Sequence, residues 1–126
     1  MSRRARPWLL LALIGSAFPW LACASALPAP SAEGARRIAA RWPNVALADL
    51  EHGRTLYAGR CASCHRLFEP ATYPADRWEK ELAEMRDRAG LDDAEERSIL
   101  QYLVSVSAQA KAASHAEGIQ PRPLEF

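Results

Sequence analysis

The stretch Cys61-Ala62-Ser63-Cys64-His65 carries the most specific chemistry in the chain. Its two thiols stand three positions apart, so both can reach the vinyl groups of one porphyrin at the end of a helix and become thioethers. The imidazole of His65 follows at once and can bind the iron as the proximal axial ligand. A Cys-x-x-Cys-His run is the signature of c-type haem attachment. The pentapeptide therefore predicts one covalent haem c, held by Cys61, Cys64 and His65.

Two other uses of a Cys-x-x-Cys pair compete with haem attachment. A thioredoxin-like redox dithiol lies near a βαβ pattern, and no alternating β-branched run flanks residues 61–65. Half of a zinc site needs further Cys or His at ligand spacing. Beyond the pentapeptide the chain has only Cys23, His52 and His115, and none forms a second paired motif. Haem attachment is thus the favoured interpretation.

Residues 1–22 have the organisation of an export signal. Three arginines within the first six residues precede an apolar run over residues 8–18, and small residues follow. This order is typical of a secretory signal peptide. The run is too short, and too soon interrupted by Pro19, for a good membrane-spanning helix. Haem c is attached outside the bacterial cytoplasm, so the two motifs support each other, and we expect an exported, periplasmic protein.

Cys23 lies at the end of this signal, in Leu21-Ala22-Cys23-Ala24-Ser25. The small residue before the cysteine is typical of a lipoprotein cleavage site, although Trp20 stands where such sites usually have leucine. Cleavage there would make Cys23 the acylated first residue and anchor the protein in a membrane. Cleavage after Ala24 or Ala26 would discard Cys23. Neither outcome makes Cys23 a haem or metal ligand.

The composition of residues 23–126 indicates three further segments. Removal of residues 1–22 leaves 13 basic and 15 acidic residues, a balance that does not favour nucleic-acid binding. Residues 23–46 begin with prolines and serines, and we expect a tether followed by an N-terminal linker or helix. Residues 47–108 are the expected haem domain, and residues 109–126 are an expected flexible tail. So small a domain is short of hydrophobic core, and a covalent macrocycle would supply one.

Three helices are expected in the haem domain, which gives an all-α fold class. The first covers about residues 47–61 and delivers the pentapeptide at its C-terminal end. The second begins near Pro74 and ends at Gly90, and its residues 78, 82, 85 and 89 share one apolar face. The third begins at Asp92, which forms a capping box with Glu95. Its apolar stripe consists of residues 99, 102, 103 and 106.

Over about residues 47–106 the chain resembles a class I c-type cytochrome domain. The resemblance rests on Gly53 and Tyr57 ahead of the pentapeptide, and on Ile99-Leu100-Gln101-Tyr102-Leu103 in the last helix. It implies a small helical domain around one covalent haem, with the first and last helices crossing at small and aromatic residues. The stretch Trp78 to Met85 is also similar to haem domains of quinohaemoprotein amine dehydrogenases and of dihaem cytochromes. Those proteins carry more than one haem, whereas the single motif here predicts one.

The sixth iron ligand is the open question of this site. Met85 is the only methionine after residue 22, and it lies about where the cytochrome family places its axial methionine. A thioether opposite His65 would raise the reduction potential and suit electron transfer. Met85 also fits plain core packing with Trp78, and it lies in a predicted helix, whereas the family's methionine lies in a loop beside Pro and Gly. The alternatives are His52, His115 and an open position.

Further expectations concern the surroundings of the haem. The family resemblance implies that the Pro70 carbonyl accepts a hydrogen bond from His65 Nδ1 and fixes the imidazole. Pro70 equally fits a simple break between helices. Trp78, Tyr73 and Arg77 are candidates for hydrogen bonds to the haem propionates, and Trp78 fits plain packing as well.

Two functions remain on these grounds. The first is a periplasmic monohaem c-type cytochrome, not an enzyme, which passes single electrons between a redox donor and a redox acceptor protein. The alternative is a haem sensor or peroxidase-like protein with an exchangeable sixth ligand. No arginine–histidine pair at a recognisable distal spacing is evident, so electron transfer is the favoured function.

Overall fold

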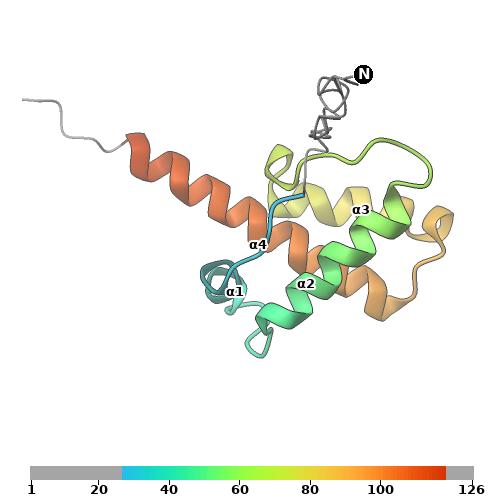
Figure 1. The fold of residues 1–126 in the computed structure, drawn as a ribbon, viewed down its shortest axis with the longest axis horizontal. Helices are drawn as coiled ribbons and strands as arrows, with labels where there is room; N and C mark the ends of the chain where they lie inside the picture. The colour runs from blue at the N-terminus through green and yellow to red at the C-terminus, as the bar shows by residue number, and fades with distance from the viewer. Residues whose placement is uncertain (1–26, 119–126) are drawn as a thin grey trace, which may run out of the picture.

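A computed structural model describes residues 27–118, which form four α-helices and two short helical turns (Figure 1). The helices are α1 (Ala32–Ile38), α2 (Leu47–Leu56), α3 (Ala75–Ala89) and α4 (Asp93–Gly118). The turns are η1 (Tyr57–Cys61), which is π-helical and continues α2, and η2 (Pro70–Thr72), which is a 3-10 turn. No strand occurs in residues 27–118, so the predicted all-α class is confirmed. No helix in that range is long and apolar enough to cross a membrane.

The three predicted helices begin where their sequence signals indicate, and the first two also end there. Helix α2 with η1 covers the expected residues 47–61. Helix α3 ends at Gly90, whose φ of 61° lies in the left-handed region that favours glycine. The Asp92 carboxylate accepts hydrogen bonds from the backbone N–H groups of Ala94 and Glu95, both at 2.8 Å. The backbone N–H of Asp92 donates a hydrogen bond to the Glu95 carboxylate at 3.3 Å, which completes the predicted capping box.

Helix α4 is the centre of the fold and packs against the other three helices (Figure 1). It crosses α2 at Gly53, where the two backbones nearly touch. A Cβ atom added to Gly53 would lie 2.0 Å from the carbonyl oxygen of Ser98 and 3.0 Å from the Cβ of Tyr102. The predicted crossing of the first and last helices of the haem domain is therefore present, at the residues that carried the family resemblance.

The buried side chains form two clusters around α4. The main cluster joins η1, α3 and α4, and the smaller one joins α1 and α2 to α4. The main cluster consists of Tyr57, Trp78, Leu82, Leu91, Ile99, Tyr102, Leu103 and Val106, and the smaller one of Ile38, Leu50 and Val104. The apolar stripes predicted for the second and third helices thus meet in one core.

Residues 27–31, which we call the N-terminal strap, lie against the folded body instead of forming a tether. Leu27 packs on the main cluster. Its carbonyl accepts a hydrogen bond from Arg54 at 2.8 Å, and the Pro28 carbonyl accepts one from the Tyr102 hydroxyl at 2.9 Å. Extended, proline-rich backbone leaves its carbonyl groups free for such distant donors. The expectation of a tether therefore fails for residues 27–31.

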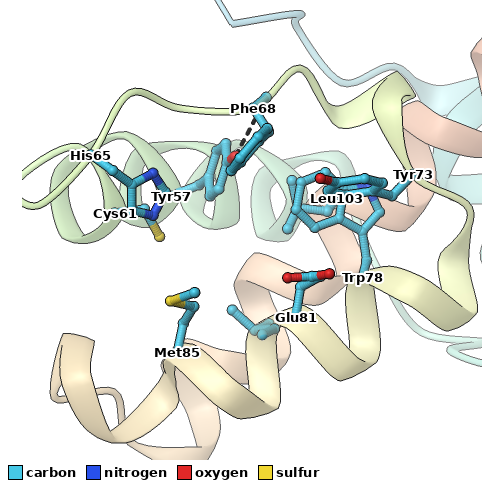
Figure 2. Close-up of a pocket in the computed structure, with 10 residues that line it drawn as sticks. Tyr57, Cys61, His65, Phe68, Tyr73, Trp78, Glu81, Met85 and Leu103 are labelled. Atoms are coloured by element: carbon cyan, nitrogen blue, oxygen red, sulfur yellow. Dashed lines mark hydrogen bonds between the residues drawn. The ribbon is translucent and has the colours of Figure 1, made fainter.

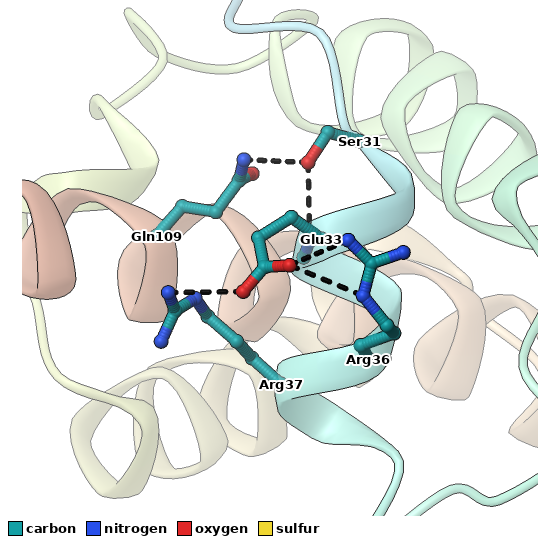
Figure 3. A network of polar contacts seen from close by, with 6 residues as sticks. Ser31, Glu33, Arg36, Arg37 and Gln109 are labelled. Carbon is teal, nitrogen blue, oxygen red and sulfur yellow. Dashed lines mark hydrogen bonds and ion pairs between the residues drawn. The ribbon is translucent and has the colours of Figure 1, made fainter.

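Helix α1 continues from the strap and is also joined to α4 (Figure 3). Ser31 caps α1, and its hydroxyl accepts a hydrogen bond from Gln109 at 2.5 Å. On the helix surface, Glu33 pairs with Arg36 at 2.6 Å and with Arg37 at 3.0 Å. Helix α1 is an addition to the three helices expected in the haem domain, and it falls in the segment expected to be a tether and linker or helix.

The last helix is longer than expected. Helix α4 continues to Gly118, whereas a flexible tail was expected from residue 109. Alanine is the strongest helix former, and it recurs at residues 108, 110, 112, 113 and 116. The predicted signal peptide, Cys23 and the end of the predicted tail lie outside the described residues.

Candidate functional site

A cleft opens between α3 and the chain around the pentapeptide (Figure 2). It holds about 410 Å³ of empty space, part of which is open to solvent. Its lining is mostly aromatic and aliphatic. The lining residues are Tyr57, Cys61, His65, Phe68, Tyr73, Trp78, Glu81, Leu82, Met85 and Leu103.

The cleft brings together residues that the sequence analysis assigned to opposite faces of an iron. Figure 2 shows Cys61 and His65 on one side of the cleft and Met85, from α3, on the other. The π-helical turn η1 ends at Cys61, so the sulfur is delivered to the cleft at the end of a helix, as expected. Met85 is half-buried on the α3 face that also carries Trp78 and Leu82.

The orientation of His65 leaves one ring nitrogen free for a metal. Its Nδ1 lies 2.7 Å from the carbonyl oxygen of Arg66. A carbonyl oxygen can only accept a hydrogen bond, so Nδ1 carries the hydrogen and the lone pair is on Nε2. This is the tautomer that a histidine needs in order to bind iron through Nε2. The hydrogen bond goes to Arg66, not to Pro70 as predicted.

The Pro70 carbonyl is used by Trp78 instead. The indole Nε1–H of Trp78 donates to it at 2.8 Å, and both residues are buried. A buried indole N–H needs a partner, and η2 places the carbonyl beside the first turn of α3. The hydrogen bond predicted from His65 to Pro70 is therefore not that of the structure, and the single indole N–H of Trp78 already has a partner. Trp78 lines the cleft, whereas Pro70 is not among the lining residues.

Aromatic rings form one part of the cleft wall. The Tyr73 and Trp78 rings meet edge-on with centroids 5.0 Å apart, and Phe68 lies 5.7 Å from Tyr73. The Tyr57 hydroxyl donates to the Phe68 carbonyl at 2.8 Å. Burial raises the pKa of Tyr57 well above its usual range, so the phenol stays neutral. This part of the cleft is uncharged and is held by packing and hydrogen bonds.

The two thiols of the pentapeptide differ in their surroundings. Cys61 is half-buried and lines the cleft, and Cys64 is exposed and lies outside the lining. Burial raises the pKa of the Cys61 thiol, and the neighbouring Cys64 adds to this effect. Cys61 is therefore a neutral thiol at physiological pH, next to the space that a porphyrin would fill.

The competing ligands of the sequence analysis lie elsewhere. His52 on α2 and His115 on α4 are both exposed, and neither lines the cleft. Within residues 27–118, no three His, Cys, Asp or Glu side chains gather in a way that could hold a metal ion. Of the candidates for propionate contacts, Tyr73 lines the cleft and the Arg77 guanidinium lies over its ring at 4.4 Å.

Sequence reasoning did not single out Phe68 or Glu81 as cleft residues. Glu81 could have been found, because it lies three residues after Trp78 and four before Met85, on the same helix face. Phe68 offered no such signal, because it lies in an irregular segment and is 47% exposed.

The lining fits a covalently bound haem. It combines aromatic and aliphatic walls with an imidazole nitrogen, a thiol and a thioether, which is the donor set of a c-type centre with His and Met axial ligands. These groups come from η1, from the segment after it and from α3, so their meeting depends on the fold as a whole.

Comparison with known proteins gives one match. A family model described as dihaem cytochrome c matches residues 57–124, which is more than half of the chain. The matched region begins in η1 and includes the pentapeptide, α3 and α4. No curated protein and no solved structure matches the chain.

Proposed function

Because this chain belongs to the dihaem cytochrome c family, we propose that it is an exported c-type cytochrome that passes single electrons between a donor and an acceptor protein. Membership of this family supports haem binding and a role in electron transfer. We add that the protein is a carrier and not an enzyme, and that its partners are redox proteins.

The observation that supports this proposal most directly is the cleft, in which His65 and Met85 lie on opposite sides. We assign Cys61 and Cys64 to the thioether links, His65 to the proximal position and Met85 to the distal position. When bound, haem c supplies a reversible one-electron change between Fe(III) and Fe(II). The aromatic and aliphatic walls would shield part of the haem from water, and the hydrogen bond to Arg66 keeps His65 in the ligating tautomer.

One haem per chain is part of the proposal. The 126-residue sequence contains a single Cys-x-x-Cys-His motif, although the description of the family names two haems. The third cysteine, Cys23, stands alone and far from the cleft residues in the sequence. It cannot supply a second pair of thioether links.

We further propose a periplasmic location with a lipid anchor at Cys23. The support is the arginine-led apolar run of residues 1–22, the small residue before Cys23, and the need to attach haem c outside the cytoplasm. The mature protein would then begin at Cys23 and exchange electrons at a membrane surface.

The number and linkage of the haems can be measured directly. The full-length gene is expressed in bacteria that attach haem c, and the intact mass and the haem absorbance per chain are determined after denaturation. We expect one haem that stays with the chain. Cys61→Ala and Cys64→Ala should each leave a single thioether and shift the pyridine haemochrome band. Two haems per chain, or haem that dissociates on denaturation, would contradict the proposal.

The sixth ligand is tested by the absorption spectrum. Oxidised protein with a Met85 ligand should show the weak far-red band of His/Met haem, and Met85→Ala should abolish it. His52→Ala and His115→Ala are matched controls, which should leave the spectrum unchanged because both side chains lie outside the cleft. A high-spin spectrum and rapid carbon monoxide binding in the unmodified protein would favour a sensor or a peroxidase-like protein instead.

A further inference from the structure

Glu81 is the only carboxylate among the 10 residues that line the cleft in the described part of the chain. It lies on the α3 face that carries Trp78 and Met85, and Figure 2 shows its carboxylate directed into the cleft between these two side chains. A charge in a wall of this kind needs an explanation, because a carboxylate beside apolar groups loses part of its hydration.

An arginine one turn earlier in α3 holds Glu81 in place. The Nε atom of Arg77 lies 3.1 Å from Oε1 of Glu81. The Arg77 guanidinium also lies 4.4 Å from the centroid of the Tyr73 ring, which lines the cleft itself. The Arg77 side chain is 55% exposed and that of Glu81 is 34% exposed. The carboxylate is therefore the more shielded of the two charges, and Arg77 itself does not line the cleft.

Ion pairs within a single turn of the other helices do not place a carboxylate in the cleft. Arg36 pairs with Glu33 on α1, and Arg54 pairs with Glu51 on α2, but none of these side chains lines the cleft. Exposed pairs of this kind contribute little to stability. A gain in helix stability alone would thus not require the carboxylate to face the cleft.

We propose that Glu81 lowers the reduction potential of the haem and that Arg77 limits this effect. The inference rests on the proposed function, because it requires a haem in the cleft. Ferric haem has one more positive charge than ferrous haem, so a nearby carboxylate favours the oxidised state and a nearby guanidinium favours the reduced state. Coulombic energies grow as the distance and the effective dielectric constant fall, so the partly shielded Glu81 acts more strongly than a carboxylate in water.

The test measures the midpoint potential of the full-length holoprotein by spectroelectrochemical titration. Glu81→Gln keeps the shape of the side chain and removes its charge. We expect this variant to favour the reduced state at least twofold. At 59 mV per tenfold change in the equilibrium constant, this raises the midpoint potential by about 18 mV. Arg77→Gln should lower the potential, and the double variant should lie closer to the unmodified protein than either single variant.

Glu84→Gln is the matched control, because Glu84 carries the same charge on the exposed face of the same helix. A larger shift for Glu81→Gln than for Glu84→Gln supports the inference, and equal shifts overturn it. If the Glu81→Gln variant does not retain haem, the Arg77→Gln variant provides the test. A lower midpoint potential in Arg77→Gln supports the inference, and an unchanged or higher one overturns it. Absence of covalent haem in the unmodified protein would refute the proposed function, whereas normal haem with no shift in Glu81→Gln would refute this inference alone.

Discussion

Tyr102 shows how a single side chain joins parts of the chain that are far apart in sequence. Its ring is fully buried beside Tyr57, with ring centroids 6.2 Å apart. Its hydroxyl donates to the Pro28 carbonyl at 2.9 Å. Burial raises the pKa of Tyr102 to about 12. The neutral phenol is therefore the form on which the fold depends, because a phenolate could not donate this hydrogen bond.

We predict that the protein loses stability as the pH rises from 10 to 12. The phenol has its ordinary pKa of 10.0 in the unfolded chain and a pKa of about 12 in the folded one. The unfolded chain releases its proton first, so this contribution to stability is complete below pH 10 and is lost as the pH approaches 12. The free energy of unfolding, measured with denaturant at several pH values across this range, gives the loss of stability per pH unit.

Tyr102→Phe is the informative variant for this prediction. At neutral pH it should be about 1 kcal/mol less stable, because the hydrogen bond to the strap is lost. At alkaline pH its stability should decline less steeply than that of the unmodified protein. An equally steep decline in both proteins would show that other groups cause the alkaline loss.

Single residues also show where sequence reasoning succeeds and where it stops. Cys61, His65 and Met85 were predicted to lie around one site, from a motif and a helix face, and the cleft brings all three together. The bond from Trp78 to Pro70 was not predicted. It depends on the path of the irregular segment between η1 and α3, which no periodic pattern describes.

At the scale of the elements, the crossing of α2 and α4 is the contact least able to change. Gly53→Ala should destabilise the fold by about 2 kcal/mol or more, because the added Cβ would lie 2.0 Å from the Ser98 carbonyl oxygen and the helices would have to move apart. The midpoint of urea unfolding measures this loss.

Gly59→Ala is the control for that substitution. Gly59 lies in η1, and a Cβ there would meet no atom within 4 Å. Because alanine favours helical backbone more than glycine does, this variant should be as stable as the unmodified protein or slightly more stable. Equal losses for the two variants would contradict the role given to the crossing.

The elements that were predicted and those that were missed differ in what stabilises them. Helices α3 and α4 each have an apolar stripe, α3 has a clear end signal at Gly90 and α4 a clear start signal at Asp92, and both helices could be predicted. Helix α1 has only 7 residues, which is too short for a stripe to stand out. Its contact with Gln109 is tertiary, so sequence patterns nearby give no sign of it.

At the scale of the whole molecule, the N-terminal strap closes one side of the main cluster. A mature chain that begins at Ser31 should be about 2 kcal/mol less stable than one that begins at Leu27, because it loses two hydrogen bonds and the packing of Leu27. Thermal unfolding of the two holoproteins measures the difference. If both unfold at the same temperature, the strap makes no contribution to stability.

The strap also determines how far the molecule could move on a lipid anchor. It begins at Leu27, four residues after Cys23. An extended chain covers at most about 3.6 Å per residue, so an acyl group on Cys23 would keep the folded body within about 14 Å of the bilayer surface. Electron exchange would then become a two-dimensional search. Such an anchor would favour partners that present their own redox centres in the same shallow layer above the lipid.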